Sequence, residues 1–148
     1  MRVQRIMLSL LAAVAVMAST ALVGLAPASA VTTREAKFLT KINNARAAHG
    51  LRPLRLAGDL STTARQHSRQ MASATTLFHT ANFATICCWS SIAENVGMGY
   101  SVRELHRAFM QSSAHRANIL NPRMRVLGVG VVSSDGRLWV TELFTRPS

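Results

Sequence analysis

The 148-residue chain contains only two cysteines, and they are adjacent at positions 87 and 88. Neighbouring cysteines cannot join distant segments to each other. An intact pair would form a strained vicinal ring, and the alternatives are two free thiols or bonds to another chain. No CxxC or Cys/His pattern surrounds Cys87 and Cys88, which argues against a structural metal there. The fold is therefore expected to depend on a hydrophobic core.

Two short catalytic signatures are also absent. The chain has no Gly-x-Ser-x-Gly motif, so no nucleophile elbow is expected. The segment GMGYS, residues 97–101, lacks the lysine and the spacing of a phosphate-binding loop. Ser112 and Ser113 stand close to His115 in the sequence, but no recognisable triad accompanies them. There are no internal repeats, and the N-terminal segment is the only low-complexity tract.

Acidic side chains are scarce, with 6 against 17 lysines and arginines. The chain starts with MRVQR, continues with a long uncharged apolar run, and reaches the small residues Ala28-Ser29-Ala30. This order predicts a secretory signal peptide over residues 1–30. The alternative is a membrane anchor, since the apolar run is about long enough to span a bilayer. Cleavage would leave residues 31–148, the size of one domain.

Loss of residues 1–30 would leave 15 basic and 6 acidic side chains. We expect the secreted domain to have no stable membrane span and no nucleic-acid partner. Cell-envelope polymers or anionic lipids are then the expected anionic partners. A generally basic soluble surface with no particular partner is the alternative.

Helical periodicity dominates the first half of the domain. Thr32 and Glu35 form a predicted capping box, and Gly50 a predicted stop, for a helix over about 33–49. Residues 51–56 form a connector. Asp59 is expected to cap a second helix, on which His67 is a packed core residue. The expected apolar stripes of these helices are Phe38, Ile42, Ala45 and Ala48 in the first, and Leu60, Ala64, His67 and Met71 in the second.

The second half mixes a helix with strands. Residues 81–91 are expected to form a surface loop, and 92–100 a strand ending in a Gly-x-Gly turn. A capping box, Ser101 with Glu104, predicts a helix to about Ser112, followed by a short helical turn over 113–119. The apolar stripe of the helix that starts after Ser101 would hold Val102, Leu105, Ala108 and Phe109. His106 would lie beside this stripe, near solvent. Residues 126–132 and 137–144 are expected to form a hairpin around SSDG, with the second strand covered on both sides. The class is α+β, with an antiparallel sheet covered by helices.

Three residues are candidates for chemistry. His79 and His115 lie at the ends of elements, where side chains can reach a cleft. Glu94 interrupts the apolar segment AENVG, and a buried carboxylate needs a partner. Together they could form a metal site or an acid/base group. Alternatively, Glu94 caps backbone amides and both histidines are ordinary surface or core residues. His49 ends a helix and is not a candidate.

Several segments together resemble one known family. They are LTKINNARAAHGLRPL, LSTTARQHSRQMA, FHT, IAENVG, AFMQSSAHRANILNP, LGVGVV and LWVTELF. In this order and spacing they are similar to the CAP superfamily of cysteine-rich secretory proteins, antigen 5 and pathogenesis-related proteins, in its single-domain secreted bacterial branch. The resemblance implies a three-layer α-β-α sandwich with a small antiparallel sheet. It covers nearly all of residues 36–146.

The resemblance also implies site residues. His79, Glu94 and His115 match family positions that line a cavity, and Ser112 stands where many eukaryotic members have a second glutamate. The three matching residues would hold a divalent cation, zinc most of all, with lower affinity because one carboxylate is missing. Glu94 is the candidate catalytic residue if a bound water reacts.

Three functions follow from the resemblance. The first is an extracellular binding module for a lipid, a sterol-like molecule or an envelope ligand. The second is a metal-dependent, protease-like hydrolase that uses the same cleft. The third is a structural envelope protein whose cleft is vestigial. Fold alone does not choose among them.

Overall fold

The computed structural model describes residues 31–86 and 88–148. The predicted signal peptide over residues 1–30 and the residue Cys87 lie outside these ranges. The elements in chain order are α1 (Thr33–Ala48), β1 (Arg55–Leu56), α2 (Gly58–Ala74), η1 (Phe83–Thr85), β2 (Trp89–Gly99), α3 (Val102–Gln111), α4 (Ser113–Ile119), β3 (Val126–Ser134) and β4 (Arg137–Pro147). Within the described ranges, no helix has both the length and the apolar character needed to cross a bilayer.

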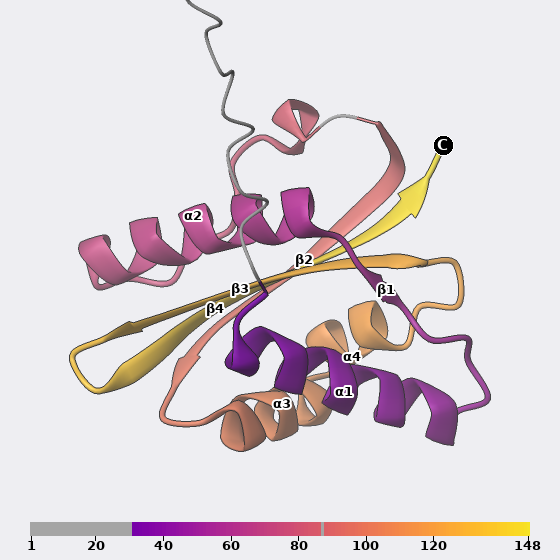
Figure 1. The fold of residues 1–148 in the computed structure, drawn as a ribbon, viewed down its shortest axis with the longest axis horizontal. Coiled ribbons are helices and arrows are strands. Elements are labelled where there is room, and N and C mark those ends of the chain that lie inside the picture. The colour runs from indigo at the N-terminus through magenta and orange to yellow at the C-terminus, as the bar shows by residue number, and fades with distance from the viewer. Residues whose placement is uncertain (1–30, 87) are drawn as a thin grey trace, which may run out of the picture.

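The four strands form one sheet in the order β1-β3-β4-β2. Helix α2 covers one face, and α1, α3 and α4 cover the other, so the predicted three-layer α-β-α sandwich is confirmed (Figure 1). The sheet is antiparallel, as expected, except at its β1 edge. Arg55 and Leu56, predicted as connector, pair in parallel with Val126 and Leu127 of β3. Two residues are too short a strand to leave a periodic signal.

Helix α1 begins and ends at the predicted signals. Glu35 accepts from the Thr32 backbone N–H at 2.8 Å, and Thr32 accepts from the Glu35 N–H at 3.3 Å. At the other end Gly50 has a φ of 68°, and the Leu51 N–H bonds the carbonyl of Arg46 at 2.9 Å. This is a Schellman arrangement, which stops the helix.

The buried face of α1 differs from its predicted stripe. Phe38 and Ile42 are fully buried as expected, but Ala48 is exposed. The remaining buried positions on this helix hold the charged residues Glu35 and Arg46. Apolar periodicity cannot identify a charged residue whose partners come from other parts of the chain.

Three further local predictions are wrong. Ala57 is the N-cap of α2, and Asp59 lies in its first turn. On α3, Ala108 is exposed. His106 on the same helix is half-buried, because α1 packs against α3. Burial, and then the charge of Lys41, lowers the pKa of His106.

The strands are longer than the sequence indicated. β2 begins at Trp89, inside the predicted surface loop, and β4 continues to Pro147. From Leu138 to Thr145 every residue of β4 is buried, so the prediction that this strand is covered on both sides is confirmed. Cross-strand pairing on both sides of β4 explains the added length.

Helix α2 lies directly on the backbone of β3. A Cβ atom on Gly128 would collide with Leu60, and one on Gly130 would collide with the backbone of Ala64 and Arg65. Glycine at these two positions therefore lets the helix approach the strand closely. The contact fixes the position of α2, which carries His67, over the sheet.

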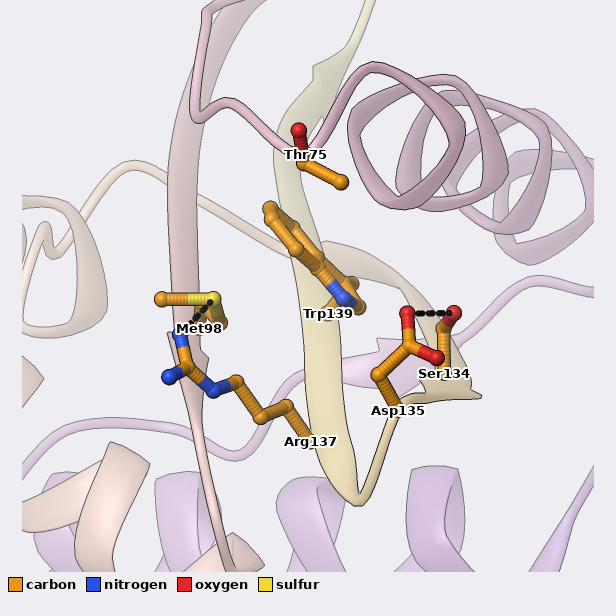
Figure 2. A pocket seen from close by; sticks show the side chains of 6 residues that line it. All are labelled: Thr75, Met98, Ser134, Asp135, Arg137 and Trp139. Atoms are coloured by element: carbon orange, nitrogen blue, oxygen red, sulfur yellow. Dashed lines mark hydrogen bonds between the residues drawn. The ribbon is translucent and has the colours of Figure 1, made fainter.

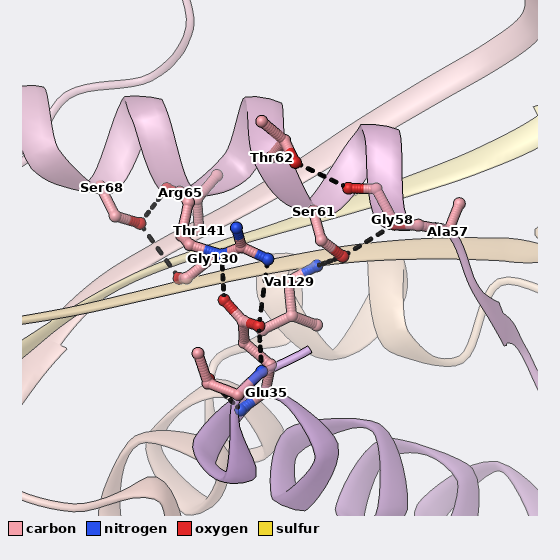
Figure 3. Close-up of polar contacts among 11 residues, drawn as sticks. Glu35, Ala57, Gly58, Ser61, Thr62, Arg65, Ser68, Val129, Gly130 and Thr141 are labelled. Carbon is pink, nitrogen blue, oxygen red and sulfur yellow. Dashed lines mark hydrogen bonds and ion pairs between the residues drawn. The ribbon is translucent and has the colours of Figure 1, made fainter. Parts of the chain in front are cut away.

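A polar seam joins α2 to the sheet and to α1 (Figure 3). The Arg65 Nε donates to Glu35 Oε1 at 2.6 Å, and the side chain of Glu35 is fully buried. One turn further along α2, the Ser68 hydroxyl lies 3.0 Å from the Gly130 carbonyl and 2.9 Å from the Thr141 hydroxyl. These buried polar groups have partners, as a water-excluded seam requires.

Candidate functional site

The site begins at Glu94 of β2, whose side chain is only 1% exposed. One carboxylate oxygen lies 2.8 Å from His79 Nδ1 and accepts from the Thr80 N–H at 2.9 Å. The other accepts from the Thr80 hydroxyl at 2.6 Å. The structure therefore brings His79 and Glu94 together. It also shows Glu94 capping a backbone amide, which was the alternative interpretation of this residue.

His79 occupies the segment that follows α2, and its side chain is 61% exposed. Since Nδ1 faces the carboxylate, Nε2 is the ring nitrogen directed away from it. A carboxylate behind one nitrogen fixes the orientation of an imidazole and favours a proton on that nitrogen. His79 is thus an exposed and oriented imidazole.

A second histidine stands beside Glu94. His67 is 7% exposed, and its Nε2 bonds the Phe78 carbonyl at 2.9 Å. The His67 and Phe78 rings meet edge to face, with 5.1 Å between their centroids. The prediction of a packed, hydrogen-bonded histidine is confirmed. The sequence did not indicate that His67 Nε2 also lies 3.9 Å from the Glu94 carboxylate.

His115 lies on α4, in the helical layer on the opposite face of the sheet from α2 (Figure 1). It is half-buried on α4, and its ring packs against Phe109 with 5.0 Å between centroids. Burial, and then the charge of His79, lowers the pKa of His115, which favours its neutral imidazole. Across residues 31–86 and 88–148, no three His, Cys, Asp or Glu side chains are grouped closely enough to hold a metal ion.

Ser112 occupies the junction between α3 and α4. It is the C-cap of the first helix and the N-cap of the second, and its side chain makes no cap hydrogen bond. The backbone therefore turns at the residue that matches the second glutamate of the family pattern. The hydroxyl supplies no carboxylate charge, so Glu94 is the acidic residue of this site.

A buried polar network ties α4 to the sheet, and sequence reasoning missed it. The Asn95 amide donates to the His115 carbonyl at 3.2 Å and to Glu142 Oε2 at 3.0 Å. The Asn118 amide donates to Asn95 Oδ1 at 2.9 Å and to the Glu94 carbonyl at 3.2 Å. A signal was available, because AENVG, HRANIL and VTELF each place a polar side chain among apolar ones.

Glu142 is the most unusual member of this network. Its side chain is completely buried, and burial raises its pKa to about 8, although the Asn95 hydrogen bond acts in the opposite direction. Within the described residues, its Oε1 has no hydrogen-bond partner. The carboxyl is therefore protonated and uncharged at neutral pH.

A pocket of about 240 Å³ opens away from these residues, at the β3–β4 hairpin (Figure 2). Trp139 forms its wall. The polar groups around it are engaged with each other: Arg137 contacts Met98 Sδ at 3.4 Å, and the Ser134 hydroxyl donates to Asp135 at 3.0 Å. One acid and one base line this pocket, so it has no pronounced charge preference.

The structure defines the oxidation state of Cys88. Cys88 is disulfide-bonded, and no described cysteine is free. Its backbone adopts a φ of 76°, which non-glycine residues rarely use. Cys87 lies outside the described residues.

Comparison with known proteins identifies the family. The family model "CAP: Cysteine-rich secretory protein family" matches residues 39–144. An uncharacterised protein, YkwD of Bacillus subtilis, is 31% identical over 130 residues, which cover 80% of this chain and 49% of the relative. The chain belongs to the CAP family, and it spans about half the length of that relative.

Solved structures share the fold. An outer surface protein of Borrelia burgdorferi matches with a TM-score of 0.73 at 15% identity, covering 80% of this chain and 96% of that one. An extracellular protein of Bacillus anthracis with an SCP domain matches with a TM-score of 0.68 at 21% identity. There, 75% of this chain and 39% of the other are covered. Structural neighbours of this domain thus include extracellular and outer-surface bacterial proteins.

Proposed function

We propose that this chain is an extracellular CAP-domain binding protein whose ligands are anionic components of the cell envelope. One observation carries the proposal, namely the division of charge between core and surface. Glu35, Glu94 and Glu142 are buried, so half of the 6 acidic side chains are removed from the surface. Of the basic side chains in the described residues, only Arg46 and Arg65 are buried. The side chains that are not buried in residues 31–148 therefore number 13 basic and 3 acidic, against 15 basic and 6 acidic in total, so acidic groups are much rarer on the surface than in the sequence.

An outer surface of this kind attracts polyanions and anionic lipid headgroups, and salt weakens the attraction. Structural neighbours on bacterial surfaces and outside cells support the same location for this chain. Neither a lipid nor a polymer is favoured by surface charge alone. Catalysis is less well supported, because both oxygens of Glu94 are engaged with His79 and Thr80.

The test is a binding assay with residues 31–148, which contain every described helix and strand. We expect the protein to co-sediment with phosphatidylglycerol vesicles, or to form a complex with a soluble anionic polymer. Binding should weaken as salt rises to about 0.15 M and beyond, because screening then shortens the reach of the charges. Equal binding to phosphatidylcholine vesicles, or no binding to any anionic probe at low salt, would contradict the proposal.

A second candidate property is weak binding of a divalent cation by His79 and His115. The arrangement of His79, with Glu94 behind Nδ1 and Nε2 directed away, matches the way carboxylates orient metal-binding imidazoles. The lowered pKa of His115 keeps the neutral form that metals bind. We propose zinc as the cation, with Glu94 acting by orienting His79. Two imidazoles are fewer ligands than protein zinc sites generally use, so affinity should be low.

Calorimetric titration with zinc tests this second candidate. We expect saturable binding by the wild-type domain and none by His115→Ala, because one of two imidazoles is removed. Glu94→Gln should weaken binding by about 10- to 100-fold through loss of the orienting carboxylate. His49→Ala is the matched control, since His49 is an exposed histidine that bonds only the Ala45 carbonyl. Unchanged affinity in His115→Ala would refute the assignment.

A further inference from the structure

A basic pocket of about 330 Å³ lies between the start of α3 and the exposed side of α1. We define it by its lining residues: Arg34, Lys37, Lys41, Tyr100, Ser101, Val102, Arg103 and Leu138. Val102 and Leu138 are buried and form an apolar floor. None of the lining residues is acidic. The pocket also holds Lys37 and Lys41, the only two lysines in the chain.

The four cations of the basic pocket come from two helices. Arg34, Lys37 and Lys41 follow the i, i+3, i+7 spacing, which places them along one face of α1. Arg103 faces them from the first turn of α3. None of the four makes an ion pair with a described residue. The nearby carboxylate of Glu104 accepts from the Tyr100 N–H at 3.0 Å, as part of the α3 cap.

These charges do not help the domain to fold. Like charges three or four residues apart on a helix repel each other, as Arg34 and Lys37 do. Arg34 and Arg103 also lie in first turns, where the helix dipole favours negative side chains. An anion between α1 and α3 would reverse both effects. The arrangement of cations in the basic pocket is therefore more favourable when an anion is bound than when the pocket is empty.

Tyr100 extends the pocket outward. It is 68% exposed, and the Arg137 guanidinium lies over its ring, 5.8 Å from the centroid. This places a fifth cation at the rim and an aromatic face beside it. A ligand entering the pocket would therefore meet positive charge before it reaches the apolar floor.

The spacing of the cations indicates the size of the ligand. From Arg34 to Lys41 the axis of α1 rises by about 10 Å, which exceeds the width of one phosphate group. A flat bilayer surface cannot enter a concave pocket, whereas a flexible chain can. Both lysine and arginine bind phosphate oxygens. The lysine ammonium acts as a compact positive charge, and the planar arginine guanidinium donates two parallel hydrogen bonds. We propose that the basic pocket binds consecutive phosphate groups of a phosphodiester polymer of the cell envelope.

This assignment rests on the proposed function, and it names the surface and the chemical class of the ligand. The probe is poly(glycerol phosphate), titrated into residues 31–148 at low salt, with phosphatidylglycerol vesicles as a separate arm. The pocket variant is Lys37→Ala/Arg103→Ala, which removes one exposed cation from each helix. The matched control is Arg123→Ala/Arg146→Ala, which removes the same charge from exposed positions beside a different pocket.

We expect the pocket variant to lose roughly tenfold or more in affinity for the polymer and to show a shallower salt dependence. The control should lose less than about threefold, through the overall charge alone. Neither variant should melt below the wild-type temperature, since none of these side chains has an ion-pair partner among the described residues, and the pocket variant should melt slightly higher because it loses like-charge repulsion on α1 and a cation in the first turn of α3.

Equal losses in the two variants would overturn the pocket assignment and leave the proposed function standing. Wild-type binding to the vesicles but not to the polymer would also overturn it, with lipid as the ligand. If the wild type binds neither probe, the proposed function itself fails.

Discussion

Replacing Arg46 with methionine is expected to lower the free energy of unfolding by about 4 kcal/mol. Arg46 is fully buried, and its guanidinium is held by backbone carbonyls instead of a carboxylate. Nε donates to the Arg52 carbonyl at 2.9 Å, and Nη1 donates to the Ile119 and Asn121 carbonyls at 2.8 and 3.0 Å. Methionine fills similar space but leaves these acceptors without donors. Chemical denaturation of residues 31–148 in urea measures the loss.

Arg52→Met is the matched control for this prediction. The Arg52 side chain is exposed, and only its carbonyl takes part in the contact, so the same chemical change should cost less than about 0.5 kcal/mol. Arg46→Lys should recover little of the stability lost in Arg46→Met, because one ammonium group cannot replace a planar guanidinium that donates to several carbonyls. If Arg46→Met were as stable as Arg52→Met, the guanidinium would not be holding α1 to the segment between α4 and β3.

Glu142→Gln is expected to stabilise the domain by about 3 kcal/mol at pH 7. Below the ordinary pKa of 4.5 the carboxyl is protonated in both the folded and the unfolded chain and contributes no penalty. As pH rises towards the folded pKa of about 8, only the unfolded chain ionises, so the stability of the wild type falls. Glutamine matches the shape of the protonated carboxyl and can keep the Asn95 hydrogen bond.

Urea denaturation between about pH 4 and pH 9 tests this prediction. The difference between Glu142→Gln and the wild type should be near zero at the acid end, grow by about 1.4 kcal/mol per pH unit, and level off above pH 8. Asp135→Asn is the control, because it removes an exposed carboxylate from the hairpin turn and should leave the pH profile parallel to that of the wild type. Parallel curves for Glu142→Gln would mean that this carboxyl is not desolvated.

Local signals in the sequence predicted local structure well. The capping pairs at Thr32 and Ser101 and the stop at Gly50 are found in the helices, and so are the large apolar residues of each predicted stripe, although Ala48 and Ala108 are exposed. The α-β-α layers came from the family resemblance and from the two-sided pattern of β4. Asp59 failed as a cap, because the preference for a capping residue does not fix which residue leaves the helical conformation.

The errors share a physical origin in contacts between distant segments. Glu35 and Arg65 are 30 residues apart, and Arg46 bonds carbonyls up to 78 residues away. Periodicity treats such charges as solvent-facing, so their burial could not be read from the sequence. The contact between His79 and Glu94 was predicted, whereas the place of His67 beside Glu94 depends on how α2 rests on β3. The assignment of His79, Glu94 and His115 as metal ligands stays a prediction.

The strand order has a consequence for how the polypeptide acquires its structure during synthesis. β4 comes last among the described elements, yet it lies between β3 and β2 in the sheet, and among the described strands β2 pairs with β4 alone. The 11 residues of β2 therefore have no strand to pair with until β4, which starts more than thirty residues later, has been synthesised. Such non-local pairing slows folding and delays it until β4 has been synthesised. A chain cut off before β4 should remain unfolded, open to proteolysis and able to thread through a narrow channel.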